Sequence, residues 1–151
     1  MVKAFDVVVL GSAVASAAGN ARVFNNCPFS VTAWSVGGQI SAPHNIATGR
    51  TYSEPFTRDP QSGGRAIKIT LRPDGLLRGD PETDFAYNLD GNTIWYDLSD
   101  VMGDPFKGHR LVEASSNPSC PRIVWENGIP PAGSQVKNCQ ADADVTLTLC
   151  A

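Results

Sequence analysis

Two stretches in the middle of the chain alternate between apolar and polar residues on either side of Asp90-Gly91. In residues 84–89 and 92–98, every second side chain falls on the same side of an extended strand. Asp-Gly is a favoured two-residue loop between antiparallel strands. We therefore predict a hairpin in which Asp84 lies directly opposite Asp97.

The predicted hairpin has one apolar face and one polar face, as expected for a sheet that is buried on one side only. The apolar face consists of Phe85, Tyr87, Leu89, Ile94, Tyr96 and Leu98. The polar face consists of Asp84, Ala86, Asn88, Thr93, Trp95 and Asp97.

A second alternating run closes the chain at residues 144–150, with Val145, Leu147 and Leu149 on one face. It predicts a final strand that carries Cys150 towards an opening strand. Glycine and proline recur at short intervals as turn residues, and no segment keeps a helical period or forms a linker or a repeat. The pattern therefore predicts an all-β protein with one domain.

The first residues have the order of a cleavable secretory leader. Lys3 precedes an apolar run at residues 7–10, and small residues follow, including Ala15-Ser16-Ala17 as a cleavage signature. We predict a leader at residues 1–17 and a single domain at residues 18–151. The alternative is a short buried strand. A membrane-spanning helix is not expected, because the run is too short to span a bilayer.

The chain has four cysteines, which suits an exported protein and permits three disulfide pairings. A bridge from Cys27 to Cys150 would join the two ends of the domain, and Cys120 and Cys139 would then close a short loop. Loop-closure arguments give the long bridge about 4–5 kcal/mol and the short one roughly 3 kcal/mol.

The net charge of −3 argues against nucleic acid and anionic lipid as partners. The chain has no dinucleotide-binding, P-loop or nucleophile-elbow motif, so we predict no cofactor. His44 and His109 are its only histidines and have no metal-ligand spacing, so we predict no metal.

The predicted pairing of Asp84 with Asp97 is unfavourable unless the two carboxylates are solvated, share a proton or face a cation. If they are close, one pKa rises, and the pair becomes a candidate for acid–base or nucleophilic catalysis. The alternative is two solvated acids on a strand face. A change of one residue in the loop would separate them.

Trp95 lies on the same polar face as these acids. An exposed indole there needs a cover, which is either a flat apolar ligand such as a sugar ring or another loop of the protein. Trp34 and Trp125 are predicted to pack in the core or against loops.

Three segments resemble the thaumatin-like proteins. Residues 21–34, Ala-Arg-Val-Phe-Asn-Asn-Cys-Pro-Phe-Ser-Val-Thr-Ala-Trp, resemble the opening strand of the family, and Cys150 matches the partner of its cysteine. Asp84-Phe85 and Ile94-Trp95-Tyr96-Asp97-Leu98-Ser99 resemble the family's acidic signature, with the same spacing between the two acids. The chain is most similar to the small four-cysteine fungal members, which include yeast-phase-specific and conidial-germination proteins.

This resemblance implies an antiparallel β-sandwich stapled by Cys27–Cys150 and Cys120–Cys139, without the extra disulfide-rich domain of the large plant members. It also implies an acidic cleft that binds, and in some members cleaves, β-1,3-glucan. The ligand-binding residues expected from it are Asp84, Trp95, Asp97, Asp100, Asp104 and Arg58, with Tyr52 or Tyr87 as further stacking rings.

The cleft departs from the family pattern at several positions. Asp84 replaces a glutamate, Met102 stands where a third acid is expected between Asp100 and Asp104, and Arg58 is only the nearest match to the cleft arginine. A carboxylate withdrawn by one methylene group weakens catalysis, because catalysis is sensitive to displacements of about 1 Å. We therefore expect a binding surface first, with Asp84 and Asp97 as candidate catalytic residues.

Three functions follow as hypotheses. The first is a secreted monomer, extracellular or in the cell wall, that binds β-glucan or takes part in wall remodelling during growth or germination. The second is a weak endo-β-1,3-glucanase that uses the aspartate pair. The third is an antifungal or host-surface-binding protein. None of them requires nucleic acid or membrane insertion.

Overall fold

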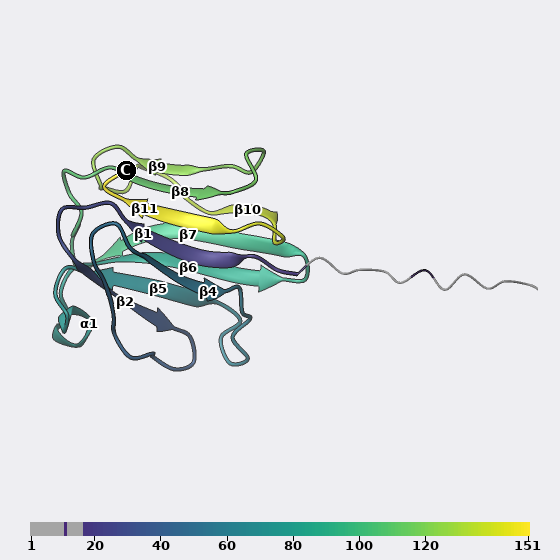
Figure 1. Cartoon of the computed structure of the whole chain (residues 1–151), viewed down its shortest axis with the longest axis horizontal. Helices are drawn as coiled ribbons and strands as arrows, with labels where there is room; N and C mark the ends of the chain where they lie inside the picture. The colour runs from purple at the N-terminus through teal and green to yellow at the C-terminus, as the bar shows by residue number, and fades with distance from the viewer. Residues whose placement is uncertain (1–10, 12–16) are drawn as a thin grey trace, which may run out of the picture.

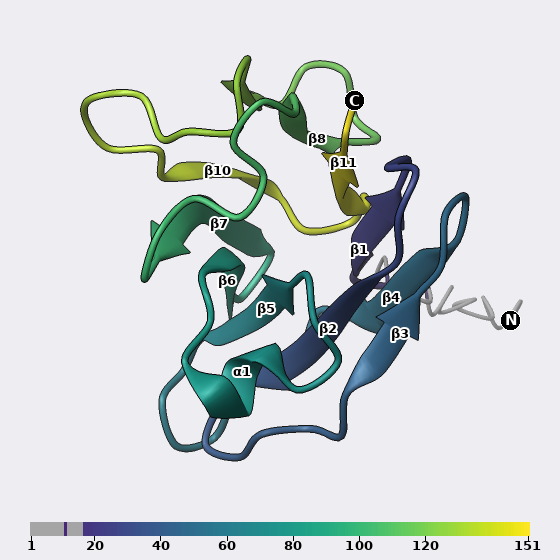
Figure 2. The same cartoon turned by 90° about the vertical axis from the view of Figure 1, so that its left-hand side faces the viewer.

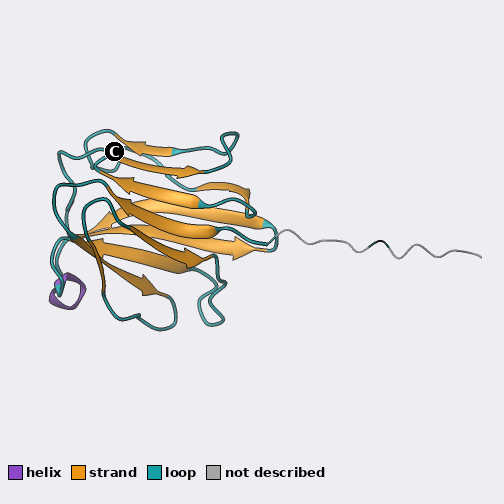
Figure 3. Ribbon diagram, viewed as in Figure 1, coloured by secondary structure: helices purple, strands orange, loops and turns teal. Residues whose placement is uncertain are grey.

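The computed structural model describes Gly11 and residues 17–151. The predicted leader falls on residues 1–17, nearly all of them outside the described part, and it stays a prediction. Two β-sheets pack face to face (Figure 1), and Figure 3 shows how little of the chain is helical. The all-β sandwich predicted from the sequence is therefore confirmed.

The five strands of sheet A lie in the order β4 (Thr51–Pro55), β1 (Asn20–Asn25), β11 (Val145–Leu149), β8 (Leu111–Ser115) and β9 (Ile123–Trp125). The six strands of sheet B lie in the order β10 (Lys137–Gln140), β7 (Thr93–Val101), β6 (Glu82–Asp90), β5 (Arg65–Thr70), β2 (Val31–Val36) and β3 (His44–Ile46). A short helix, α1 (Gly75–Arg78), follows β5 and lies at one end of the sandwich (Figure 2).

Alternating side chains from the two sheets fill the space between them. The core includes Val23 of β1, Leu147 of β11, Ile67 of β5 and Phe85 of β6, all fully buried. Trp125 also lies in this core, as predicted, whereas Trp34 is buried on the outer side of sheet B, where β2 pairs it with Lys68. Burial of each large apolar side chain contributes about 1.5–3 kcal/mol.

The first and last strands are neighbours, as predicted for the closing strand. β1 and β11 run parallel, with Ala21 opposite Val145 and Asn25 opposite Leu149, while all the other strand pairs in the described part are antiparallel. The parallel pair brings Cys27 and Cys150 together just beyond the strand ends, where they form a disulfide. Cys120 and Cys139 form the second disulfide.

The central hairpin forms, but its predicted register is wrong. Asp90 pairs with Thr93, so the two loop residues are Gly91 and Asn92, and Asp84 lies opposite Ser99. Gly91 has a φ of 58° while Asn92 has no positive φ, and glycine at the first loop position is typical of a type II′ turn. Because the register moves by two residues, every side chain keeps its predicted face.

Glu113 is a carboxylic acid buried in the core. It lies on β8 between Leu147 and Ile123 of the neighbouring strands, it is 0 % exposed, and neither carboxyl oxygen has a hydrogen-bond partner in the described part. Burial raises the pKa of this carboxyl well above its usual value, and the charge of Asp97 raises it further. The folded protein therefore favours a neutral Glu113.

We expect the substitution Glu113→Gln to stabilise the protein at neutral pH. The folded state holds the proton of Glu113 more tightly than the unfolded state, so the wild type loses stability as pH rises above about 4.3. The variant lacks this loss and is expected to gain at least about 1 kcal/mol at pH 7, since one pKa unit is worth about 1.4 kcal/mol. Urea unfolding at pH 4 to 8 measures the difference.

The control is Glu126→Gln, because Glu126 is exposed and pairs with Arg110 at the surface. Its effect is expected to stay within about 0.5 kcal/mol at every pH. A Glu113→Gln variant that is no more stable than the wild type at neutral pH would contradict the prediction.

Candidate functional site

An open groove with a volume of about 380 Å³ crosses the outer face of sheet B. β5, β6 and β7 form its floor, where Ala66 pairs with Ala86 and Ala86 with Asp97. Because the two alanine side chains are small, the surface of the sheet is hollow at this point. Its walls come from residues at the end of β2, from the loop before β5 and from Val136 before β10.

Trp95 supplies the largest ring in the groove. Its side chain shares the outer face with Asp97, two residues further along β7, and with Asn88, its partner on β6. The residue is 41 % exposed, so the sheet presents an indole to solvent as predicted. The Oδ1 atom of Asn88 is buried and has no hydrogen-bond partner in the described part. Aromatic and polar groups thus lie together in the groove.

A second group of side chains continues along the same face. Lys68 on β5 donates a hydrogen bond to Glu82 Oε1 at 2.6 Å and another to Asp84 Oδ2 at 3.1 Å. We call these three residues the lysine–acid cluster. Asp84 is 8 % exposed, and its Oδ1 has no partner among the described residues. Burial raises the pKa of Asp84 to about 6, with Glu82 adding to the effect and Lys68 opposing it.

Asp84 and Asp97 share a face but are not directly opposite, which corrects the predicted pairing. Asp84 lies opposite Ser99, so Asp97 is its diagonal neighbour, at about 7–8 Å in a regular antiparallel pair. Asp97 lies in the groove and its Oδ1 accepts the amide hydrogen of Leu98 at 2.9 Å. The two acids therefore have separate surroundings and separate partners.

Asp100 and Asp104 lie near the end of β7. Asp100 is paired with Thr83, on the opposite side of the strand from Asp97, and its Oδ1 accepts a hydrogen bond from Thr83 Oγ1 at 2.6 Å. Burial, together with the nearby carboxyls of Asp104 and Asp84, raises the pKa of Asp100 to about 7, against the hydrogen bond from Thr83, which lowers it. These acids border the lysine–acid cluster and do not line the groove.

Arg58 and Met102 also lie outside the groove lining. Arg58 belongs to the loop before β5 and takes part in no ion pair among the described residues. Met102 has a φ of 60° and is 74 % exposed, so a strained turn presents it to solvent. The arginine that does line the groove is Arg65.

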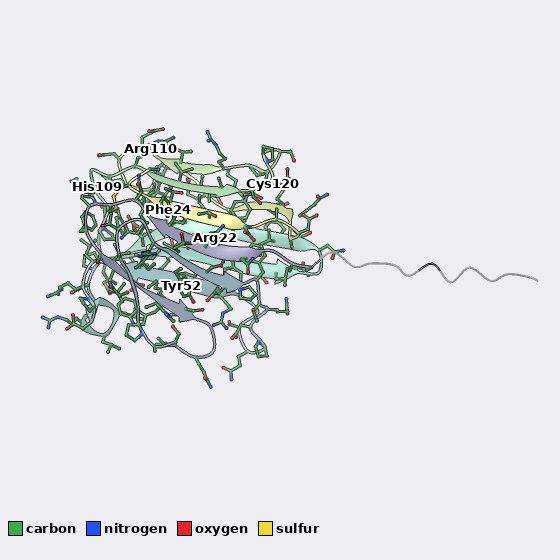
Figure 4. The ribbon with its side chains drawn as sticks, in the orientation of Figure 1. Arg22, Phe24, Tyr52, His109, Arg110 and Cys120 are labelled. Carbon is green, nitrogen blue, oxygen red and sulfur yellow. A yellow bond between two sulfur atoms is a disulfide. The ribbon has the colours of Figure 1, made fainter. Side chains whose placement is uncertain are left out.

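Arg65 is held by a polar network between the sheets. Its guanidinium approaches Glu54 at 3.8 Å and Asp59 at 3.6 Å. The hydroxyls of Tyr52 and Tyr87 both donate to Glu54, each at 2.6 Å. Tyr52, labelled in Figure 4, therefore points from β4 into this network, and the ring of Tyr87 is buried. Neither is placed as the stacking ring that the resemblance suggested.

Sequence reasoning placed Asn88 on the same face as the acids but missed Arg65 and Lys68 as their neighbours. The signal was present, because residues 65–70 alternate and place Ala66 and Lys68 on the same outward face as the acids of β6. Within the described residues, no group of three or more His, Cys, Asp or Glu side chains is arranged to hold a metal ion. No helix of the described part is long and apolar enough to cross a membrane.

Sequence comparisons match the chain over nearly its whole length. The model of a family described as Blastomyces yeast-phase-specific protein matches residues 9–151. An antigenic thaumatin-like protein of Arthroderma benhamiae is 30% identical over 145 residues, which cover 88% of this chain and 71% of that protein. The secreted thaumatin-like protein calA of Emericella nidulans is 27% identical over 145 residues, covering 89% and 82% of the two chains.

Solved structures share the fold. The protein elicitor MoHrip2 from Magnaporthe oryzae superposes with a TM-score of 0.73 at 24% identity, covering 89% of this chain and 100% of that one. The thaumatin-like xylanase inhibitor TLXI has a TM-score of 0.60 at 12% identity, covering 87% and 99%. At these identities the similarity establishes the architecture alone.

We expect Lys68→Met to destabilise the protein by about 2 kcal/mol at pH 7.5, because it leaves Glu82 and Asp84 without their shared cation. Without Lys68 the pKa of Asp84 rises above its wild-type value of about 6, so the loss is expected to shrink as pH falls towards 6, where the variant takes up a proton before the wild type does. Urea unfolding at pH 4.5 and pH 7.5 measures both values. Lys107→Met is the control, since Lys107 is exposed and has no ion pair among the described residues. A loss of the same size at both pH values would argue against this role for Lys68.

Proposed function

The chain belongs to the family of the Blastomyces yeast-phase-specific protein and is a secreted fungal thaumatin-like protein, and from this premise we propose that it binds a cell-wall polysaccharide in the groove around Trp95. β-1,3-Glucan, a neutral polysaccharide, is the first candidate ligand. Secretion would use the leader proposed for residues 1–17. The bound polysaccharide would place the protein in or at the wall, with a role in remodelling during growth or germination.

The exposed indole of Trp95 is the observation that carries this proposal. A groove that binds a ligand is mostly apolar and has a few polar groups that fix the ligand's orientation. The floor of this groove is built from Trp95, Ala66 and Ala86, and Asp97 and Asn88 lie beside the ring. Sugar rings have an apolar face that suits an indole, and their hydroxyl groups donate hydrogen bonds to a carboxylate.

Hydrolysis is the second candidate, and one observation favours it. Asp84 and Asp97 are diagonal neighbours on one face, with backbone positions about 7–8 Å apart in a regular antiparallel pair, and inverting glycosidases place two carboxyl groups on either side of the scissile bond about 6.5–9.5 Å apart. The raised pKa of Asp84, about 6, also suits a general acid. Against hydrolysis, Lys68 already binds Oδ2 of Asp84 and its other oxygen is buried. We therefore place binding before catalysis.

The third candidate is a role at the surface of another organism. Its support is that one solved structure with the same fold is named a protein elicitor. No arrangement of the described residues indicates such a target in this chain. A protein that fails to bind any wall polysaccharide would move this candidate to first place.

We expect Trp95→Ala to lower the affinity for insoluble β-1,3-glucan about thirtyfold, since truncation of a central aromatic contact costs about 2 kcal/mol or more. Sedimentation with the polysaccharide measures the bound fraction. Leu77→Ala is the matched control, because Leu77 is an apolar residue of α1 that is 82 % exposed and does not line the groove. Equal retention of both variants would refute the groove as the binding site.

Release of reducing sugar from laminarin tests the second candidate. If Asp97 acts as the base of an inverting glucanase, Asp97→Asn lowers the rate at least about a hundredfold. Equal rates for the wild type and this variant would remove hydrolysis from consideration.

A further inference from the structure

The face that carries the groove has more carboxylates than cations, and we propose that its preferred polysaccharide is a cationic one, built from amino sugars whose amino groups are free. This inference rests on the proposed function, because it names the class of ligand for the same groove. It differs from the proposal of a neutral β-glucan because the acids that follow Trp95 along the sheet would bind the amino groups of the ligand.

The charges of this face do not balance. Asp97, Asp84 and Glu82 all point outward from β6 and β7, and Lys68 is the cation that faces them among the described residues. Arg65 lines the groove, but its guanidinium faces the carboxylates of Glu54 and Asp59. The outward face is therefore left with more negative than positive charge.

Arg58, in the loop before β5, makes no ion pair among the described residues but does not line the groove. Two other cations, before and within α1, are paired with acids. Arg72 pairs with Asp80, and Arg78 pairs with Asp74. Net negative potential over a groove attracts cationic ligands and excludes anionic ones.

Asp84 lacks a partner for one of its carboxyl oxygens. It is 8 % exposed and points to the same face as Asp97, yet its Oδ1 has no hydrogen-bond donor in the described part. Burial raises the pKa of Asp84 to about 6 although Lys68 lowers it, so this one cation does not offset the loss of solvation and further positive charge would stabilise the carboxylate. An ammonium group above the face supplies that charge, whereas a sugar hydroxyl does not.

The spacing on β7 suits a polymer. Trp95, Asp97 and Ser99 are successive outward positions, about 6.6 Å apart along the strand, and they pair with Asn88, Ala86 and Asp84. Consider a polysaccharide that runs along β7 with one sugar ring stacked on Trp95. Its next units then lie over Asp97 and after that over the lysine–acid cluster. Each unit with a free amino group brings one charge to this row of acids.

The experiment compares two ligands that differ at their amino groups, which are free and cationic in one and acetylated and neutral in the other. A β-1,4-linked glucosamine hexamer and its fully N-acetylated counterpart have the same rings, linkage and length. Titration calorimetry at pH 6.5 measures the affinity of the full chain for each. At low salt we expect the free amine to bind about tenfold more tightly, since several exposed ion pairs together reach that factor. At 0.5 M salt the ratio is expected to approach one.

Variants assign the preference to this face. Trp95→Ala is expected to weaken both hexamers, whereas Asp97→Asn and Asp84→Asn are expected to reduce the preference for the free amine and to spare the acetylated form. Asp142→Asn is the control, because Asp142 is an exposed acid that does not line this groove. Thermal unfolding of each variant identifies any that is misfolded.

The outcomes separate the two proposals. Equal affinity for the two hexamers, lost in Trp95→Ala, overturns the cationic preference and leaves polysaccharide binding in place. A preference that persists unchanged in both aspartate variants also overturns it, since the charge then acts elsewhere on the protein. If neither hexamer nor a laminarin oligomer binds, the proposed function fails and the inference fails with it.

Discussion

The parallel pairing of β1 with β11 is the constraint on which the rest of the structure depends. β1 lies between β4 and β11, so the first strand is an inner member of sheet A, with Arg22 and Phe24 near the middle of the sheet (Figure 4). The Cys27–Cys150 disulfide joins the ends of these two strands. At the other end, Asp144 accepts hydrogen bonds from the backbone and the side chain of Asn20. Only with this pair in place does sheet A cover the inner side of sheet B, which leaves the outer side free to carry the groove.

Alternation predicted the faces of the strands better than it predicted their partners. Phe85, Tyr96 and Leu98 are buried and Trp95 is exposed, as their positions in the pattern required. The register was wrong because Asp90-Gly91 was assigned as the loop, whereas the backbone places Gly91 at the first loop position and Asn92 at the second. A local dipeptide preference does not decide between loops that differ by one position, since both satisfy the same alternation. The resemblance to thaumatin-like proteins, which is confirmed, supplied the sandwich that alternation alone left open.

The candidate site was predictable only in part, because its acids differ in surroundings that depend on distant segments. Asp84 is paired with Lys68 of another strand, Asp97 lies open in the groove, and Asp100 meets Thr83 across the hairpin. The sequence places all three within one short stretch and offers no sign of these partners. Likewise, Arg58 and Arg65 are near each other in the chain, but only Arg65 begins a strand that crosses the site. Glu113 was hidden for the same reason, since an acid in an alternating run is charged and exposed in most strands, and here the core covers it.

The position of β1 within its sheet also bears on when the protein acquires its shape. β1 and β11, the first and last strands of the described part, pair with each other, so sheet A cannot be completed before β11 has been synthesised. Contacts between such remote segments form slowly, because closing a long loop costs conformational entropy before the contacts can stabilise the fold. The same pairing brings Cys27 and Cys150 together, so completion of sheet A and closure of the bridge between the strand ends depend on one long-range step, in a compartment where disulfides are stable.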